Sequence, residues 1–145
     1  MVTVNPYLNF SGKTEEAFKF YKSVFGGEFS MLQRFKETPE ADKFPAAERD
    51  KIMHVSLPLG NGSILMASDV PQSMAQKLKV GNNFYLSVEA GSNEEADRLF
   101  KGLSAGGKVE MPMQKTFWGA YYGSLEDKFG IQWMISHTER QQQAR

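Results

Sequence analysis

Residues 5–10, Asn5-Pro6-Tyr7-Leu8-Asn9-Phe10, decide the fold, because a similar stretch, Asn83-Phe84-Tyr85-Leu86-Ser87-Val88, follows 78 residues later. Three further pairs of similar segments come in the same order along the chain: Glu15-Glu16-Ala17 with Glu94-Glu95-Ala96, Gly26-Gly27 with Gly106-Gly107, and Gly62–Ser68 with Gly130–Ser136. Any single match could arise by chance, but four in one order indicate an internal repeat. The sequence therefore predicts two copies of one structural unit.

Each copy carries the pattern of one strand, one helix and three further strands. Alternating apolar and polar residues predict first strands at about 2–10 and 82–90, and apolar residues at helical spacing predict a helix after each. The other strands are expected at about 28–36, 51–59, 62–69, 108–115, 118–125 and 130–137. We therefore expect an α+β fold in which a single domain, 1–145, contains two βαβββ modules, 1–75 and 76–140.

Local signals mark the boundaries of these elements. Asn61-Gly62 is typical of a two-residue hairpin turn, and the segment from Ser92 to Glu95 is typical of a helix capping box. The polar segment 37–50, which contains two prolines, is expected to form a long loop, and about 70–81 to link the modules.

The composition excludes several classes of protein. The 145 residues include 17 Lys+Arg, 17 Asp+Glu and no cysteine, so disulfides, thiolate zinc sites and a cysteine nucleophile are excluded. Balanced charge without a basic cluster gives no basis for binding nucleic acid or an anionic membrane. The chain has no apolar stretch near the ~18 residues of a membrane span, and no signal-peptide pattern at its start. We expect a cytoplasmic protein.

The predicted strands have two different faces. One face is uniformly apolar and suits packing under the helices. The other face mixes amides, hydroxyls, aromatic rings and thioethers: Asn5, Tyr7, Met66, Ser68, Asn83, Tyr85 and Met134. For an isolated sheet this would be a solvated surface. Tyrosine and methionine side chains, however, are too large and apolar for a surface that contacts only water. Two such faces turned toward each other would suit a small-molecule site.

These residues carry a resemblance to the PhnB-like branch of the vicinal oxygen chelate superfamily, which includes glyoxalase I, extradiol dioxygenases and bleomycin-resistance proteins. The supporting segments span nearly the whole chain: Pro6-Tyr7-Leu8 with Glu15-Glu16-Ala17, Lys51–Val55, Ser68-Asp69, Thr116–Gly123 and Asp127–Trp133. The resemblance implies a concave eight-stranded mixed sheet of the glyoxalase/bleomycin-resistance type, a cleft for a small molecule, and a homodimer.

Metal-dependent members of this superfamily place His or Glu at four cleft-facing positions. By the repeat alignment these positions are Asn5, Met66, Asn83 and Met134 here. Two amides and two thioethers are poor ligands for the divalent ions that act as Lewis acids. We therefore expect no metal at these positions and no cofactor. No strand–glycine-rich loop–helix pattern suits S-adenosylmethionine or a nicotinamide dinucleotide either.

Three further residues are candidates for a functional role. His54 is a potential general base or ligand contact, and an equally reasonable interpretation is a structural histidine. Trp118 and Tyr122 lie in the aromatic run 117–123, where some rings are expected in core or dimer packing. Trp118 or Tyr122 could stack on a flat ligand, but alternation does not decide which residues of the run face inward.

The resulting functional expectation is a homodimer with a metal-free cleft that binds a small planar or amphipathic molecule. The alternative is a metal-dependent or acid–base lyase, isomerase or dioxygenase, with His54 as the best catalytic candidate. A purely structural dimerisation module is a third possibility. Whether the chain is an enzyme stays open on the sequence alone.

Overall fold

The computed structural model describes residues 2–72 and 77–139, and the chain divides into two compact units, Met1–Lys79 and Val80–Arg145. The predicted linker at about 70–81 contains this division, although residues 73–76 lie outside the described residues. Within these described ranges, eight strands form two four-stranded mixed sheets, one in each unit. The predicted α+β fold of two βαβββ modules is confirmed. Among the described residues, no helix is long and apolar enough to cross a membrane.

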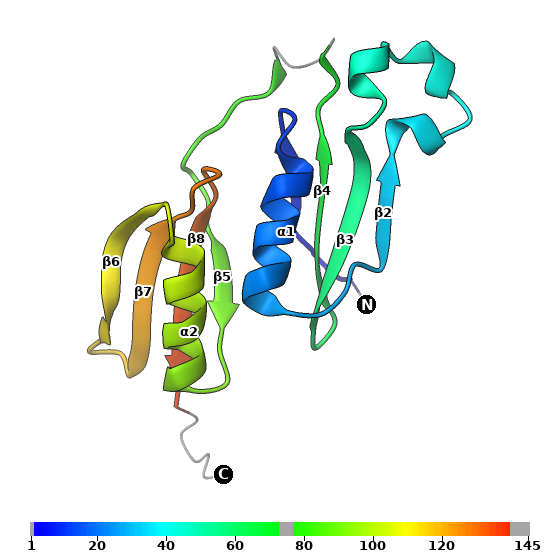
Figure 1. Ribbon diagram of the computed structural model, residues 1–145. Coiled ribbons are helices and arrows are strands. Elements are labelled where there is room, and N and C mark those ends of the chain that lie inside the picture. Colours follow the sequence, from blue (N-terminus) through cyan, green and yellow to red (C-terminus); the bar gives the residue numbers. More distant parts are fainter. Residues whose placement is uncertain (1, 73–76, 140–145) are drawn as a thin grey trace. The chain divides into compact units, whose positions relative to one another are not determined.

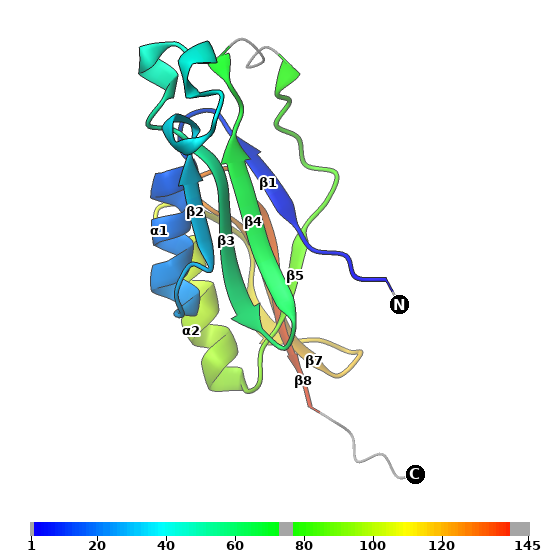
Figure 2. The ribbon, with the colours of Figure 1, turned by 90° about the vertical axis from the view of Figure 1, so that its right-hand side faces the viewer.

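The first unit contains β1 (Tyr7–Phe10), α1 (Thr14–Phe25), β2 (Met31–Arg34), β3 (Ile52–Gly60) and β4 (Ser63–Asp69). Its sheet has the order β1-β4-β3-β2, with β1 parallel to β4 and the other pairs antiparallel. Figure 1 shows β4, β3 and β2 side by side. The long loop expected between β2 and β3 contains three short 3₁₀ helices, η1 (Phe35–Glu37), η2 (Ala41–Lys43) and η3 (Ala46–Glu48). They lie beyond one end of β2 and β3 in Figure 2.

The second unit repeats this arrangement with β5 (Leu86–Glu89), α2 (Asn93–Ser104), β6 (Lys108–Lys115), β7 (Ala120–Glu126) and β8 (Gln132–Thr138). Its sheet has the order β5-β8-β7-β6, again with one parallel pair, β5 and β8. The same topology in both units confirms the internal repeat.

Each helix covers one face of its own sheet. Ala17, Phe18 and Tyr21 of α1 are fully buried, as are Leu57 and Leu65 of the strands beneath. In the second unit the buried residues are Ala96, Leu99 and Leu103 of α2 with Leu125, Trp133 and Ile135 of the sheet. Burying such side chains stabilises each unit by roughly 1.5–3 kcal/mol per large residue. The apolar face predicted from alternation is therefore the face under the helix.

The structure confirms the hairpin turn and the Ser92 cap, and it shifts one contact of the predicted capping box by a residue. Asn61 and Gly62 both have positive φ, 50° and 83°, as a type I′ hairpin requires. At the start of α2 the Ser92 hydroxyl accepts a hydrogen bond from the Glu95 N–H. The Glu95 carboxylate completes the cap on the Gly91 N–H, one residue before the position that a standard capping box uses.

The pairing of the strands corrects the repeat offset. Tyr7 lies opposite Met66 and Ser87 lies opposite Met134, so the first strands are related by 80 residues and not by 78. The physical reason is that side chains alternate with a period of two, so that any even offset gives the same alternation of faces. The error therefore moved residues along the strand without moving them to the other face.

The first strand of each module is also shorter than predicted. Residues before Tyr7 and before Leu86 are outside the strands, although the Pro6 carbonyl still accepts a hydrogen bond from the Met66 N–H. The Asn5 side-chain oxygen accepts a hydrogen bond from the Ile64 N–H, and the Gln132 side-chain amide donates to the Phe84 carbonyl. These side-chain contacts extend the pairing beyond the strands at equivalent ends of the two sheets.

Candidate functional site

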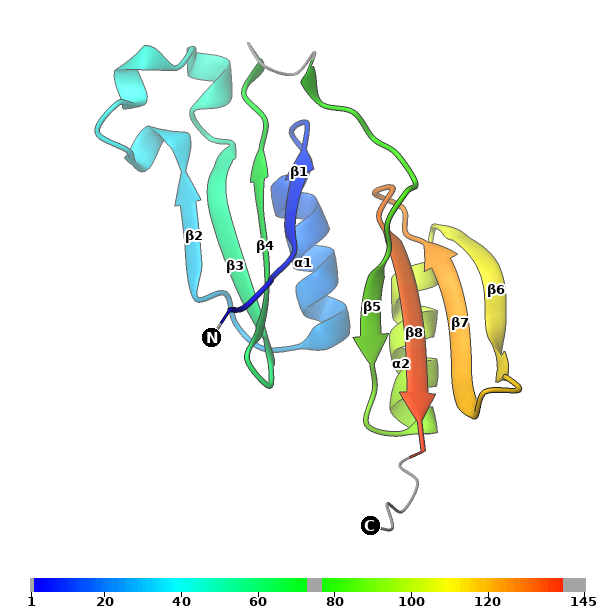
Figure 3. The same cartoon turned by 180° about the vertical axis from the view of Figure 1, so that it is seen from behind.

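The face of the first sheet away from α1, here called the first open face, carries Tyr7, Ser56 and Met66 side by side. Tyr7 and Ser56 lie opposite Met66 from the two neighbouring strands. His54 lies two residues before Ser56 on the same strand and therefore on the same face. Figure 3 shows this sheet with α1 behind it. Tyr7 is 46% exposed, so that its ring is available for contact with another molecule.

His54 is the centre of a hydrogen-bonded chain on the first open face. Its Nδ1 lies 3.2 Å from the Tyr7 hydroxyl, and its Nε2 lies 2.8 Å from the Ser56 hydroxyl. A neutral imidazole has one donor and one acceptor nitrogen, so one hydroxyl donates to the ring and the other accepts from it. The Tyr7 and His54 rings also pack together, with centroids 5.6 Å apart. This chain of hydrogen bonds holds the Tyr7 phenol and the His54 imidazole in fixed orientations.

Two other predicted residues lie at the edges of this face. The Asn5 side-chain oxygen is engaged by the Ile64 N–H, which makes this amide part of the sheet edge. Ser68 lies opposite Asn9 and donates a hydrogen bond of 3.5 Å to the Asn9 side-chain oxygen. Both amide groups therefore help to connect β1 to β4.

The second open face, on the sheet of the second unit away from α2, carries Tyr85, Tyr122 and Met134. Ser87 and Ser124 flank Met134 from the neighbouring strands, as Tyr7 and Ser56 flank Met66 in the first unit. Tyr85 precedes β5 and donates a hydrogen bond of 2.8 Å to the Glu110 carboxylate of β6. This hydrogen bond to a carboxylate raises the pKa of the Tyr85 phenol above its ordinary value.

The strand register decides the parity that alternation left open. Tyr122 lies opposite Ser136 on the second open face, whereas the Tyr121 hydroxyl donates a hydrogen bond of 2.6 Å to Asp97 of α2. That bond to Asp97 raises the pKa of the Tyr121 phenol. Trp118 lies in the turn before β7, and its ring meets that of Tyr122 edge-on, with centroids 6.0 Å apart. The sequence predicted that this strand begins at 118. In the structure the chain turns there, with Gly119 at φ 92°, and the strand begins after the turn.

Asn83 is a predicted site residue that belongs to neither open face. It lies exposed in a bend ahead of β5, because the first-strand offset of 78 placed it two residues away from the true equivalent of Asn5. Among residues 2–72 and 77–139, no group of three or more His, Asp or Glu side chains is placed to hold a metal ion. Within each unit, then, the structure brings together Tyr7, His54 and Met66, and separately Tyr85, Trp118, Tyr122 and Met134.

Sequence reasoning missed Ser56 and Glu110. Ser56 shares the parity of His54 at a spacing of two residues, so alternation along this strand could have identified Ser56 as a neighbour of His54. Glu110 is different, because its partner Tyr85 comes from the opposite edge of the sheet. Only the three-dimensional arrangement brings these two side chains together.

Comparison with known proteins assigns the family. A family model described as 3-demethylubiquinone-9 3-methyltransferase matches residues 2–136. The protein YjdN of Escherichia coli K12 is 31% identical over 146 residues, which are 95% of this chain and 97% of YjdN. Both matches extend over nearly the whole chain.

Solved structures share the fold, and one of them carries the same family description. PA1353 from Pseudomonas aeruginosa is 35% identical, with a TM-score of 0.81 over 97% of this chain and 100% of that one. A protein from Bacillus cereus named as a putative 3-demethylubiquinone-9 3-methyltransferase, PhnB protein, is 26% identical, with a TM-score of 0.68 over 94% and 100%. A glyoxalase/bleomycin resistance protein/dioxygenase family enzyme from Burkholderia phytofirmans, 17% identical with a TM-score of 0.61 over 94% and 100%, shares the fold.

The topology and the matched structures together define an α+β fold of the glyoxalase/bleomycin-resistance type. More particularly, the chain belongs to the family described as 3-demethylubiquinone-9 3-methyltransferase, and its resemblance to the PhnB-like branch of the vicinal oxygen chelate superfamily is confirmed.

That family description implies a methyl donor, and the described loops do not fit a nucleotide-type donor. Each strand-to-helix connection carries one glycine, Gly12 or Gly91, in place of a glycine-rich turn. The Gly91 N–H is already bonded to the Glu95 carboxylate, and the Thr14 N–H is already bonded to Asp69. The backbone donors that such a loop would offer to a ligand are thus used inside the protein.

Proposed function

We propose that the protein binds a small planar or amphipathic molecule on its open faces, without a metal ion. The observation that carries this proposal is the Tyr7–His54–Ser56 chain beside Met66 on the first open face. An aromatic ring and a thioether supply apolar contact area, and the oriented hydroxyl and imidazole supply a few directional hydrogen bonds. That combination is typical of small-molecule sites.

The second open face supports the proposal with a related set of groups. Trp118 is 58% exposed and Tyr85 is 38% exposed, so both rings present area to a ligand. The edge-on contact between Trp118 and Tyr122 holds the indole beside this face. A flat ligand could stack on such rings at little entropic cost to the protein, because aromatic side chains have few rotatable bonds.

The test uses 8-anilinonaphthalene-1-sulfonate, a planar amphipathic probe whose fluorescence rises in an apolar site. We expect a saturable titration with the wild-type protein. Tyr7→Ala and Met66→Glu should each weaken probe binding about tenfold, since each removes about 1.4 kcal/mol of apolar contact. Tyr85→Ala tests the second open face separately.

The matched control is Lys19→Met, an exposed side chain on α1, which covers the other face of the same sheet. It should leave the titration unchanged. Circular dichroism should show that every variant keeps the secondary structure of the wild type. Equal probe affinity in Tyr7→Ala, Met66→Glu, Tyr85→Ala and the wild type would contradict the proposal.

A second candidate function is acid–base catalysis centred on His54. The specific observation that favours it is that both ring nitrogens of His54 bond to hydroxyl groups, an arrangement in which imidazole can pass a proton between them. The test is a panel of isomerase, lyase and ring-cleavage assays on the wild type, His54→Ala and Ser56→Ala. Turnover that His54→Ala leaves unchanged would remove this candidate.

We propose, finally, that the protein acts in the cytoplasm as a homodimer. Support for self-association comes from apolar side chains exposed on the second unit, of which Phe117 is 96% exposed and Val109 51% exposed. Exposed apolar side chains of this kind are typical of contact surfaces.

A further inference from the structure

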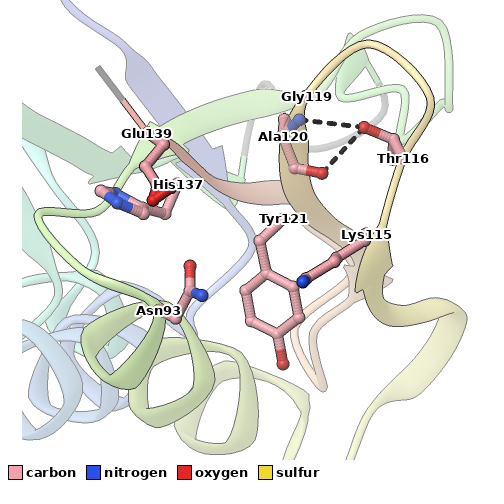
Figure 4. Close-up of a pocket in the computed structure, with 8 residues that line it drawn as sticks. All are labelled: Asn93, Lys115, Thr116, Gly119, Ala120, Tyr121, His137 and Glu139. Carbon is pink, nitrogen blue, oxygen red and sulfur yellow. Dashed lines mark hydrogen bonds between the residues drawn. The ribbon is translucent and has the colours of Figure 1, made fainter. Parts of the chain in front are cut away.

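A pocket separate from both open faces lies in the second unit, where the first residue of α2, the β6–β7 turn and the end of β8 meet (Figure 4). Its volume is about 220 Å³. Two of its lining residues, Tyr121 and His137, lie opposite each other in the sheet, on the side that faces α2. The pocket thus belongs to the helix side of the sheet and shares no residue with the proposed ligand site.

The walls of this pocket are held in place by hydrogen bonds. The Tyr121 hydroxyl donates to Asp97, and His137 Nδ1 lies 2.9 Å from the Ala90 carbonyl. A carbonyl can only accept, so Nδ1 carries the proton in this bond, and Nε2 of the neutral ring is left as an acceptor. At the turn, Thr116 and Ala120 exchange hydrogen bonds in both directions. The pocket is therefore preformed.

Opposite charges line different sides of the pocket. In Figure 4 the Glu139 carboxylate lies next to His137, whereas the Lys115 ammonium group lies on the far side of the Tyr121 ring. Within residues 2–72 and 77–139, neither Lys115 nor Glu139 forms a salt bridge. Asn93 contributes an amide between these two sides, with both donor and acceptor groups.

We propose that this pocket binds a small zwitterion of the free α-amino acid class. The ligand carboxylate would lie toward Lys115, and its ammonium group would lie toward Glu139 and Nε2 of His137. A simple anion would satisfy Lys115 but leave Glu139 opposed to it, and a simple cation would do the reverse. The volume lies below the roughly 300–1,000 Å³ of sites for drug-sized ligands, which favours a ligand of this size.

The test is a titration of the ¹⁵N-labelled full chain, followed by NMR, with L-alanine, acetate and methylammonium as separate probes. We expect saturable shifts of the amide signals of Asn93, Tyr121 and His137 with L-alanine, and much weaker binding of either half-molecule. Lys115→Met and Glu139→Gln should each weaken the binding of L-alanine about fivefold, which is the upper range for the loss of one solvent-accessible ion pair.

The matched control is Lys108→Met, which removes an exposed lysine from the other end of the same strand, β6. It should leave the affinity for L-alanine unchanged. The proposal is overturned if L-alanine gives no saturable shifts up to about 50 mM. Acetate or methylammonium binding as tightly as L-alanine would also overturn it, and would show an ordinary ion site. So would equal L-alanine affinity in the wild type, Lys115→Met and Glu139→Gln.

Discussion

At the scale of single residues, Gly107 has a steric role that its backbone angles do not reveal. A Cβ atom at this position would overlap the backbone carbonyl of Glu126 and lie 2.9 Å from the Asp127 backbone. Backbone atoms of a neighbouring strand cannot move aside as a flexible side chain can. We therefore expect Gly107→Ala to lower the free energy of unfolding by about 3 kcal/mol, the upper range for overpacking. Urea unfolding followed by circular dichroism measures this change.

The control for this prediction is Gly81→Ala. A Cβ atom at Gly81 would meet nothing within 4 Å, and no positive φ would strain an alanine there. The variant should remain within about 0.5 kcal/mol of the wild type. Equal stability of the two alanine variants would show that the strands can separate at Gly107 without cost.

At the scale of elements, one ion pair joins α1 to β2. The Arg34 guanidinium donates hydrogen bonds of 2.9 and 2.7 Å to the two carboxylate oxygens of Glu15, and a third of 2.8 Å to the Asp50 carbonyl. The hydrogen bonds from Arg34 lower the pKa of Glu15 below its ordinary value. Glu15 therefore has a lower pKa in the folded protein than in the unfolded chain. Its ion pair with Arg34 stabilises the folded protein fully above the unfolded pKa, and this stabilisation is lost as the pH falls through the folded pKa.

We therefore expect Glu15→Gln to destabilise the protein at neutral pH and to lose this effect in acid. The Glu15 side chain is 36% exposed, so solvent screening keeps the difference below about 1 kcal/mol. Urea midpoints of the variant and the wild type, measured at neutral pH and below the folded pKa, check the prediction. Glu28→Gln, which breaks a much more exposed pair with Lys22, should show a smaller difference at neutral pH. A difference for Glu15→Gln that persists in acid would assign the effect to packing.

The elements were also the level at which the sequence was most informative. Alternation placed Met66 and Met134 on the faces away from the helices, and the twofold period kept that result correct although the first-strand offset was wrong by two residues. Alternation could not say where a strand begins, because Asn5 and Asn83 continue the pattern without joining the ladder. Alternation also could not predict the contact of Tyr85 with Glu110, because the sequence of one strand does not show which residues lie beside it in the sheet.

At the scale of the whole molecule, the proposed homodimer makes a prediction about mass and about one exposed ring. Native mass spectrometry of the untagged protein should show a species of twice 16.3 kDa without a stoichiometric metal ion. Phe117 packs edge-on against Trp118 yet remains 96% exposed, the highest exposed fraction among the large apolar side chains described in its unit. Burying such a ring in an interface is worth about 1.5–3 kcal/mol per copy, so Phe117→Asp should weaken dimerisation at least tenfold.

Val80→Asp provides the comparison, since Val80 is 78% exposed but lies outside the β6–β7 turn. If both variants weaken the dimer equally, the aspartate charge is responsible and the turn has no special role. A wild-type monomer at micromolar concentration would contradict the proposed dimer. One metal ion per subunit would contradict the metal-free proposal instead, because it would require ligands other than the amide of Asn5 and the thioethers of Met66 and Met134. The two results are independent, so a single spectrum separates an error about assembly from an error about chemistry.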